Sequence, residues 1–363
     1  MGSFTAIESS GWVVLIMNQP QVRAVGTAVP PYALGQQDIK KAVSLLFRSI
    51  EHLERLLPVF ENAAIKSRHL VQPIEWYAEQ HSFAESNKIF ENTALDLTEK
   101  ASRQAMDKAG VSPEDIGMVI FVSSTGITTP TLDSKLVQKL GLAPHTHRLP
   151  IWGLGCAGGV AGLARAAQLA GSLQGKLVLL VTVELCSLTF QRHDYSKANL
   201  IGTSIFADGA AAAIVGPDGN GPVLYNSYST LFPDTEDVMG WDLVESGLKV
   251  RFSRDIPNIV RKKLPELLAK AKKEWGIDPG SIGHYVVHPG GAKVLQAYSE
   301  SLDIPDDKLK HAYDILANYG NMSSSSVLFV LDKFMTETKP TGEYGVMLTL
   351  GPGFSAEQVL FKW

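Results

Sequence analysis

Cys156 is the side chain of this sequence best placed to act as a nucleophile. It lies where a glycine-rich turn, Gly153–Gly155, meets an alanine-rich stretch, 157–172, that is predicted to be helical. A thiol at the start of a helix faces the positive end of the helix dipole and unpaired backbone amides, and both favour the reactive thiolate. The small neighbours leave room for a substrate. Taken alone, the segment is equally consistent with a buried structural cysteine.

Two further segments carry side chains that could serve the same chemistry. His288 ends a short apolar strand predicted at 284–287 and precedes a glycine-containing turn, and ligand sites in α/β sheets gather at strand ends. Asn321 opens an apolar helix predicted over 322–336. Each also has a purely structural interpretation, as a core histidine bonded to the backbone and as an ordinary helix N-cap. The turn Gly351–Phe354 after the last predicted strand is likewise an ordinary feature when taken alone.

The elements that must position these residues follow from the apolar pattern. Short apolar runs rich in β-branched residues predict buried strands, and helical stretches alternate with them. The strands are expected at 118–122, 176–183, 210–215, 284–287 and 344–350, and the helices at 92–109, 157–172, 256–275, 291–302 and 322–336. Continuous apolar strands separated by helices indicate a largely parallel sheet that is covered on both faces.

The two halves of the chain show the same order of elements. A helix, a turn and a strand over 92–122 are repeated over 256–287, which favours a duplicated fold. The loop Gly216–Pro222 is a natural boundary, so we expect one half at 21–220 and the other at 221–363. Residues 1–20 are interpreted as an extension whose role is open. Their apolar stretch, Trp12–Met17, is too short to span a membrane and has no basic residues before it, unlike a signal peptide.

The composition excludes several classes of function. The chain has 363 residues, of which 45 % are hydrophobic and 19 % charged, enough for a sizeable core. A net charge of −4 and no long basic run argue against nucleic-acid binding, and nothing reaches the length needed for membrane insertion. The two cysteines, Cys156 and Cys186, suit a reducing compartment, so a cytoplasmic location is expected. The absence of CxxC, HExxH and His-rich tracts gives a metal site little support.

In this order and spacing, the motifs resemble those of the type III polyketide synthases, the chalcone synthase-like branch of the thiolase superfamily. The resemblance runs from about residue 21 to the C-terminus and rests on Gly155–Gly159, Glu184–Phe190, Phe206–Ala210, His288–Gly291, Gly320–Ser324 and Gly351–Phe354. The stretches 71–77, 149–155, 199–206 and 236–242 are similar to bacterial members that make alkylpyrones. The resemblance implies an α/β, thiolase-like, duplicated αβαβα five-layer fold. It also implies a homodimeric acyltransferase that uses acyl-CoA and malonyl-CoA and needs no metal or redox cofactor.

The resemblance implies catalytic roles for Cys156, His288 and Asn321. Cys156 would accept the starter acyl group from coenzyme A as a new thioester. His288 would stabilise the thiolate as an ion pair and donate a hydrogen bond to the thioester oxygen. Asn321 would supply a second, neutral donor. Both donors would then stabilise the enolate that forms when malonyl-CoA loses carbon dioxide.

The same resemblance implies a set of substrate-binding residues. Phe206 matches a gatekeeper between a coenzyme A tunnel and the reaction cavity, with plain core packing as the alternative. Thr129, which precedes an expected cis proline, matches a position that reaches into the partner subunit's cavity. The remaining cavity residues are small, except Phe354: Ser124, Thr189, Gly202, Gly247, Ser323 and Phe354. Because these side chains leave space near the cysteine, we expect a medium- to long-chain fatty acyl-CoA starter, extended to alkyl α-pyrones or alkylresorcinols.

Coenzyme A phosphates are expected to contact Arg55, Lys66 and Arg68, with ordinary surface charge as the alternative.

Two other functions remain open at this stage. One is a β-ketoacyl carrier-protein synthase of the initiating type, which shares the fold but normally has a His-Gln-Ala-Asn pattern where this chain has His288-Pro-Gly-Gly. The other is a degenerate scaffold that has lost catalysis, and the presence of all three catalytic residue types argues against it.

Overall fold

The computed structural model describes residues 19–278 and 280–363, so most of the expected N-terminal extension, including Trp12–Met17, lies outside the described residues. Each half of the chain contributes one set of strands and a pair of covering helices. The strands of the first half are β1 (Gln21–Ala28), β4 (Ile116–Ser123), β5 (His147–Trp152), β6 (Leu177–Leu185) and β7 (Asp208–Gly216). Those of the second half are β8 (Val223–Leu231), β11 (Ile282–Val287), β12 (Tyr344–Gly351) and β13 (Ser355–Lys362).

These strands form one mixed sheet in the order β11-β12-β13-β8-β1-β7-β6-β4-β5. The pairs β4–β5, β4–β6 and β11–β12 are parallel, whereas β1–β7, β6–β7, β1–β8, β8–β13 and β12–β13 are antiparallel. The expectation of a largely parallel sheet is therefore wrong. Continuous apolar strands report burial on both faces and not strand direction, and the tight turn between β12 and β13 forces an antiparallel pair.

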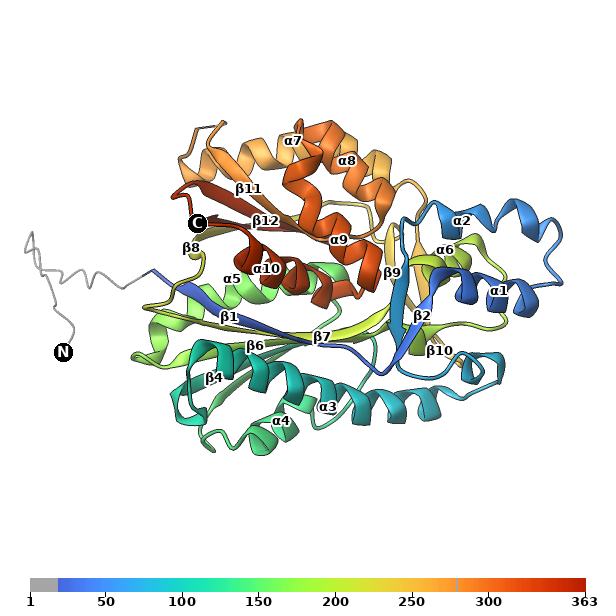
Figure 1. Cartoon of the computed structure of the whole chain (residues 1–363), viewed down its shortest axis with the longest axis horizontal. Coiled ribbons are helices and arrows are strands. Elements are labelled where there is room, and N and C mark those ends of the chain that lie inside the picture. The colour runs from blue at the N-terminus through green and yellow to red at the C-terminus, as the bar shows by residue number, and fades with distance from the viewer. Residues whose placement is uncertain (1–18, 279) are drawn as a thin grey trace, which may run out of the picture.

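The two halves repeat one topology, as the duplicated thiolase-like fold requires. The order β1-β7-β6-β4 in the first half corresponds to β8-β13-β12-β11 in the second, with the same strand directions within each set. A single residue pair, Gln21 with Val223, joins the two sets. In Figure 1, helices α3 (Phe83–Ala109) and α4 (Leu132–Leu140) form the lower layer, and α7 (Ile256–Trp275) and α8 (Ala292–Leu302) the upper one.

The central layer contains α5 (Gly158–Ala170) and α10 (Ser326–Glu337), which lie between the two sets of strands (Figure 1). The largest core cluster surrounds them and includes Val160, Leu163, Val327 and Leu331, all fully buried. Separate clusters pack α3 and α4 on one outer face and α7 on the other. The two central helices lie against each other where the halves meet, and the segments that lead into them carry Cys156 and Asn321.

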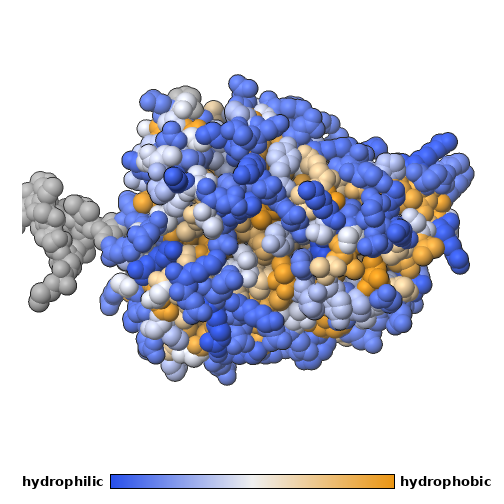
Figure 2. Space-filling model, viewed as in Figure 1, coloured by the Kyte–Doolittle hydropathy of each residue, from blue (hydrophilic) through white to orange (hydrophobic). Residues whose placement is uncertain are grey.

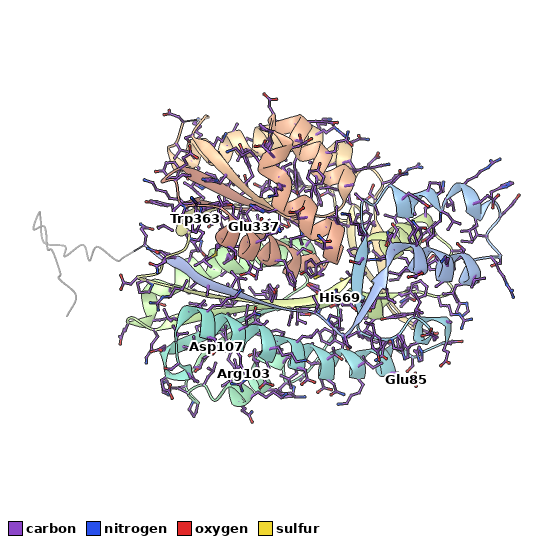
Figure 3. All side chains as sticks on the ribbon, viewed as in Figure 1. His69, Glu85, Arg103, Asp107, Glu337 and Trp363 are labelled. Atoms are coloured by element: carbon purple, nitrogen blue, oxygen red, sulfur yellow. The ribbon has the colours of Figure 1, made fainter. Side chains whose placement is uncertain are left out.

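Helix α3 begins earlier than the expected residue 92 because Ser82 and Glu85 form a reciprocal capping box at its start. Figure 3 shows Glu85, Arg103 and Asp107 along this helix and Trp363 beside Glu337 at the end of α10. The indole N–H of Trp363 donates to the Thr338 carbonyl at 3.1 Å, which fixes the chain end against α10.

A smaller group of elements packs at one end of the sheet, on the right in Figure 1. It comprises β2 (Tyr32–Gly35), α1 (Gln36–Leu46), α2 (Pro58–Glu61), β3 (Ser67–Leu70), α6 (Lys197–Ile205), β9 (Met239–Val244) and β10 (Gly247–Phe252). Helix α9 (Lys310–Tyr319) packs on β3 and α10. Apolar atoms reach the surface at this end (Figure 2), and Leu45 on α1 is 73 % exposed.

Candidate active site

Cys156 lies in a short 3₁₀ turn, η4 (Gly155–Ala157), immediately before α5. Its side chain is buried, and its backbone carbonyl accepts a hydrogen bond from the Thr349 hydroxyl at 2.5 Å. The backbone of Gly155 has a φ of +46°, a conformation that favours glycine. Cys156 therefore lies at a helix start, as expected. Strand β12, from the other half of the chain, holds its backbone through Thr349.

Asn321 lies in the second half, just before the 3₁₀ turn η8 (Ser323–Ser325) that leads into α10. A Cβ atom on Gly159 would lie 2.3 Å from the Ser324 carbonyl oxygen, so only glycine permits this approach of α5 to η8. The Asn321 amide donates from Nδ2 to the Gly290 carbonyl at 3.0 Å, and its Oδ1 accepts from the Ser323 backbone at 2.8 Å. The side-chain amide is thus held in one orientation.

His288 continues β11, since its backbone N–H donates to the Leu348 carbonyl at 2.9 Å. The ring is 3 % exposed, and neither ring nitrogen has a hydrogen-bond partner among the described residues. Gly290, whose carbonyl accepts from Asn321, is two residues further on. The short loop after His288 therefore contacts the Asn321 side chain through the Gly290 carbonyl.

Burial dominates the electrostatics of this site. It raises the pKa of the Cys156 thiol to about 11, although contacts with the Ser323 and Asn321 side chains oppose the shift. It also lowers the pKa of His288 to about 3. The helix-start effect expected to favour the thiolate is therefore outweighed when the thiol titrates alone. Transfer of a proton from a thiol to an imidazole creates a thiolate and an imidazolium whose charges cancel. Burying this ion pair therefore costs less desolvation free energy than burying either ion alone.

Glu184, which the sequence interpretation did not assign a role, lies next to this site at the end of β6. It is fully buried, and its carboxylate accepts from the Ser124 backbone N–H at 3.0 Å, the Thr125 hydroxyl at 2.9 Å and the Ser324 hydroxyl at 2.6 Å. The signal that could have identified it is an acidic residue within an otherwise apolar strand, Leu177–Leu185.

A largely apolar cavity lies between α1, α6 and the segment that follows β6. Its wall includes three of the expected substrate-binding residues, Thr189, Gly202 and Phe206. Further lining comes from α1, through Ile39, Val43 and Leu46, and from Cys186. The described residues that line this cavity do not include Cys156, His288 or Asn321. The cavity is therefore separate from the catalytic residues in this structure, with Phe206 in its wall.

The remaining expected substrate-binding residues have other surroundings. Ser124 holds the nucleophile turn, since its hydroxyl accepts from the Gly155 N–H at 3.0 Å, and Ser323 contacts Cys156. Phe354 is packed against the Phe232 ring in the core. Gly247 points toward helix α3, where a Cβ atom would lie 2.9 Å from Phe83.

Thr129 does not line the cavity of its own chain. It is exposed, and its bond to Pro130 is cis, as expected.

The three residues expected to contact coenzyme A phosphates differ in exposure. Arg55 and Lys66 are exposed, whereas Arg68 is buried and donates from Nη1 to the Thr203 and Phe206 carbonyls at 2.8 and 2.6 Å. Arg68 therefore does not fit the expected role of a phosphate contact: its guanidinium holds the end of α6 in the interior.

Within residues 19–278 and 280–363, no group of three or more His, Cys, Asp or Glu side chains could hold a metal ion. In the same ranges, every helix is too short or too polar to cross a membrane.

Comparisons with known proteins cover almost the whole chain. The family model described as chalcone and stilbene synthases, N-terminal domain, matches residues 17–219, and the corresponding C-terminal domain model matches residues 223–363. A Bacillus subtilis (strain 168) protein named "Putative chalcone synthase" is 41 % identical over 358 residues, which are 94 % of this chain and 98 % of that protein. The 1,3,6,8-tetrahydroxynaphthalene synthase of Streptomyces peucetius subsp. caesius is 39 % identical, over 94 % of this chain and 93 % of its own length.

A solved structure gives the same result. The 1,3,6,8-tetrahydroxynaphthalene synthase of Streptomyces coelicolor A3(2), described as a bacterial type III polyketide synthase, superimposes with a TM-score of 0.91 at 30 % identity. The match covers 94 % of this chain and 99 % of that one.

Proposed function

The chain belongs to the chalcone and stilbene synthase family and is a type III polyketide synthase, and on that premise we propose that it joins a medium- to long-chain fatty acyl-CoA starter to malonyl-CoA units. Enzymes of this kind are acyltransferases that use coenzyme A thioesters and need no cofactor. The proposed reaction adds two or three malonyl units and releases mainly alkyl α-pyrones, with alkylresorcinols as minor products.

Cys156 is proposed as the nucleophile that carries the starter and then the growing chain. As its thiol attacks the starter thioester, His288 takes the proton, and coenzyme A leaves. His288 and Asn321 then face the malonyl thioester oxygen, on which negative charge collects as carbon dioxide departs. The enolate carbon attacks the acyl-cysteine carbonyl, which releases the Cys156 thiolate and leaves the lengthened chain on coenzyme A. Attack of Cys156 on this new thioester returns the chain to the enzyme and releases coenzyme A. The fixed orientation of the Asn321 amide and the burial of His288 support these roles, because donors that need no rearrangement stabilise a developing charge best.

The apolar cavity beside Phe206 is the observation that carries the starter assignment. Its lining from α1 is aliphatic, through Ile39, Ala42, Val43 and Leu46. Helix α6 contributes Asn199, Gly202 and Thr203, and the small residues Thr189 and Gly202 leave space at the wall. Each methylene that an acyl chain buries there would contribute about 0.8 kcal/mol to binding. An apolar hollow of this kind suits an alkyl chain better than a strongly polar starter.

The entrance and the assembly are part of the proposal. Arg55 and Lys66 are exposed and remain candidates for the coenzyme A phosphates. A homodimer would use the edge strand β5, which carries Trp152 at 55 % exposure beside Ile127 at 44 %. Exposed aromatic and aliphatic side chains on an unpaired strand edge are typical of a protein interface. The use of coenzyme A thioesters and the two unpaired cysteines, Cys156 and Cys186, favour a cytoplasmic location.

The starter class is tested by steady-state kinetics over a series of acyl-CoA starters whose saturated acyl chains increase in length. Mass spectrometry identifies the product formed from each starter. We expect kcat/KM to rise with chain length until the cavity is filled. A flat profile, a preference for aromatic starters, or a naphthalene product made from malonyl-CoA alone would overturn the starter assignment and leave the family membership intact.

A further inference from the structure

Glu184 is a buried ionisable residue to which the proposed chemistry assigns no task. It is 0 % exposed, and the groups of the described chain that act on its carboxyl are hydroxyl and backbone N–H donors, with no Lys, Arg or His among them. Burying an ionised carboxylate without a cation is costly, so such a residue needs a physical reason to be there.

The carboxyl group of Glu184 connects two loops from opposite halves of the chain. Its Oε2 accepts from the Ser124 backbone and the Thr125 hydroxyl at the end of β4, and its Oε1 contacts the Ser324 hydroxyl in η8. Ser124 in turn holds the backbone N–H of Gly155, the residue before the nucleophile. Ser324 follows Asn321 by three residues. The Glu184 carboxyl therefore links the turn that carries Cys156 to the turn that follows Asn321.

The surroundings of Glu184 favour its neutral form. The titratable groups that face it are the thiols Cys156, from η4, and Cys186, from η6 (Cys186–Thr189). From the segment after β4 and from η8 it is faced by hydroxyl and backbone N–H donors, which favour the charged form but do not outweigh burial. Burial raises the pKa of Glu184 to about 7. A negative charge there would also oppose a thiolate on Cys156. A protonated carboxyl can retain the same partners: Oε2 still accepts from Ser124 and Thr125, and the hydrogen bond that Ser324 donates to Oε1 is reversed, so that Oε1 donates to the Ser324 hydroxyl.

We propose that Glu184 is a positioning residue that works as a neutral carboxylic acid and fixes the Cys156 turn against the Asn321 turn. This rests on the proposed roles of Cys156 and Asn321. Two consequences follow. A neutral amide of the same shape can replace the acid, and ionisation of Glu184 slows reactions that need the thiolate.

The test compares Glu184→Gln, Glu184→Ala and Ser324→Ala by two readouts that need no starter. The first is the rate of Cys156 alkylation by iodoacetamide between pH 6 and 9, in a Cys186→Ala background. The second is malonyl-CoA decarboxylation. Ser102→Ala, which removes a buried hydroxyl from α3 away from this site, is the matched control and is expected to change neither. Thermal unfolding of each variant confirms that it is folded.

At pH 6.5, both the alkylation rate and the decarboxylation rate of Glu184→Gln are expected to stay within about threefold of wild type. At pH 8.5, Cys156 of this variant is expected to be alkylated about three- to tenfold faster than Cys156 of wild type. Ser324→Ala is expected to lose about tenfold in decarboxylation with little change in alkylation, and a folded Glu184→Ala to lose more. The proposal is overturned if Glu184→Gln loses as much as Glu184→Ala, since the charge would then be required. It is equally overturned if Ser324→Ala decarboxylates normally. Wild-type protein that does not decarboxylate malonyl-CoA would contradict the proposed function, while the alkylation profile would still decide the ionisation state that Glu184 needs.

Discussion

Phe206 and Asn321 lie on two short extended segments that are joined by a pair of backbone hydrogen bonds. The Ala207 N–H donates to the Asn321 carbonyl, and the Asn321 N–H donates to the Ile205 carbonyl, both at 2.9 Å. A residue of the cavity wall from the first half is thereby fixed beside a catalytic candidate from the second. Changes at either residue are expected to affect both the cavity and the chemistry.

Cys156→Ala is expected to abolish product formation, by about 10⁴-fold or more, and to leave the fold intact. The reason is that the acyl chain would have no thiol to carry it. Product analysis by mass spectrometry measures the effect. Cys186→Ala is the control for loss of a buried thiol and should retain most of the activity. Undiminished turnover by Cys156→Ala would remove the nucleophile assignment.

Asn321→Ala is expected to reduce malonyl-CoA decarboxylation by about 10²–10³-fold, the usual cost of removing one donor to a developing oxyanion. His288→Ala should have a similar effect on the same step. Release of carbon dioxide or formation of acetyl-CoA gives the rate directly. If both variants decarboxylate at the wild-type rate, the enolate-stabilising roles are wrong.

Stability should depend on pH through Glu184. Its pKa is about 7 in the folded protein against 4.5 for an ordinary glutamate, so the folded state holds an extra proton between these values. This contribution is fully present below pH 4.5 and is lost as pH rises through about 7. Between pH 5 and 8.5 the free energy of unfolding of wild type, relative to Glu184→Gln, should fall by up to about 3 kcal/mol. Denaturant titrations at the two pH values measure it, and an unchanged difference would contradict the raised pKa.

Gly202→Leu should shift the starter optimum toward shorter chains. A Cβ atom at this position would lie 3.3 Å from the Phe206 ring and 3.5 Å from Val250, so a larger side chain must extend into the cavity. Kinetics over the same series of acyl-CoA lengths shows the shift. The exposed change Leu45→Gln on α1 serves as a control. An unaltered optimum in Gly202→Leu would mean that the acyl chain lies elsewhere.

Trp152→Glu should convert the proposed dimer of about twice 39.3 kDa to monomers. A charge at the centre of an apolar contact would be buried without a partner. Light scattering after size exclusion gives the mass. A wild-type protein that is monomeric and active would refute the dimer. Leu243→Glu, which also replaces an exposed apolar residue, is the control for a general effect of added surface charge.

The sequence by itself determined the residue types of the candidate site and most of the central elements. Gly-rich turns before alanine-rich or apolar helices placed Cys156 and Asn321 at helix starts, and the strand before His288 was predicted from its apolar run. These features depend on neighbours along the chain. Local propensity and periodicity are therefore enough to predict them.

Only the tertiary structure decided how the halves face each other. Strand directions depend on which strands pair in the sheet. The buried position of Arg68 and the role of Glu184 depend on residues more than a hundred positions apart, such as Glu184 with Ser324 at 2.6 Å and Arg68 with Thr203 at 2.8 Å. Burial also reversed the expected effect of the helix start on the Cys156 thiol. Desolvation is set by everything that surrounds a group in space, and a local pattern along the chain does not contain that information.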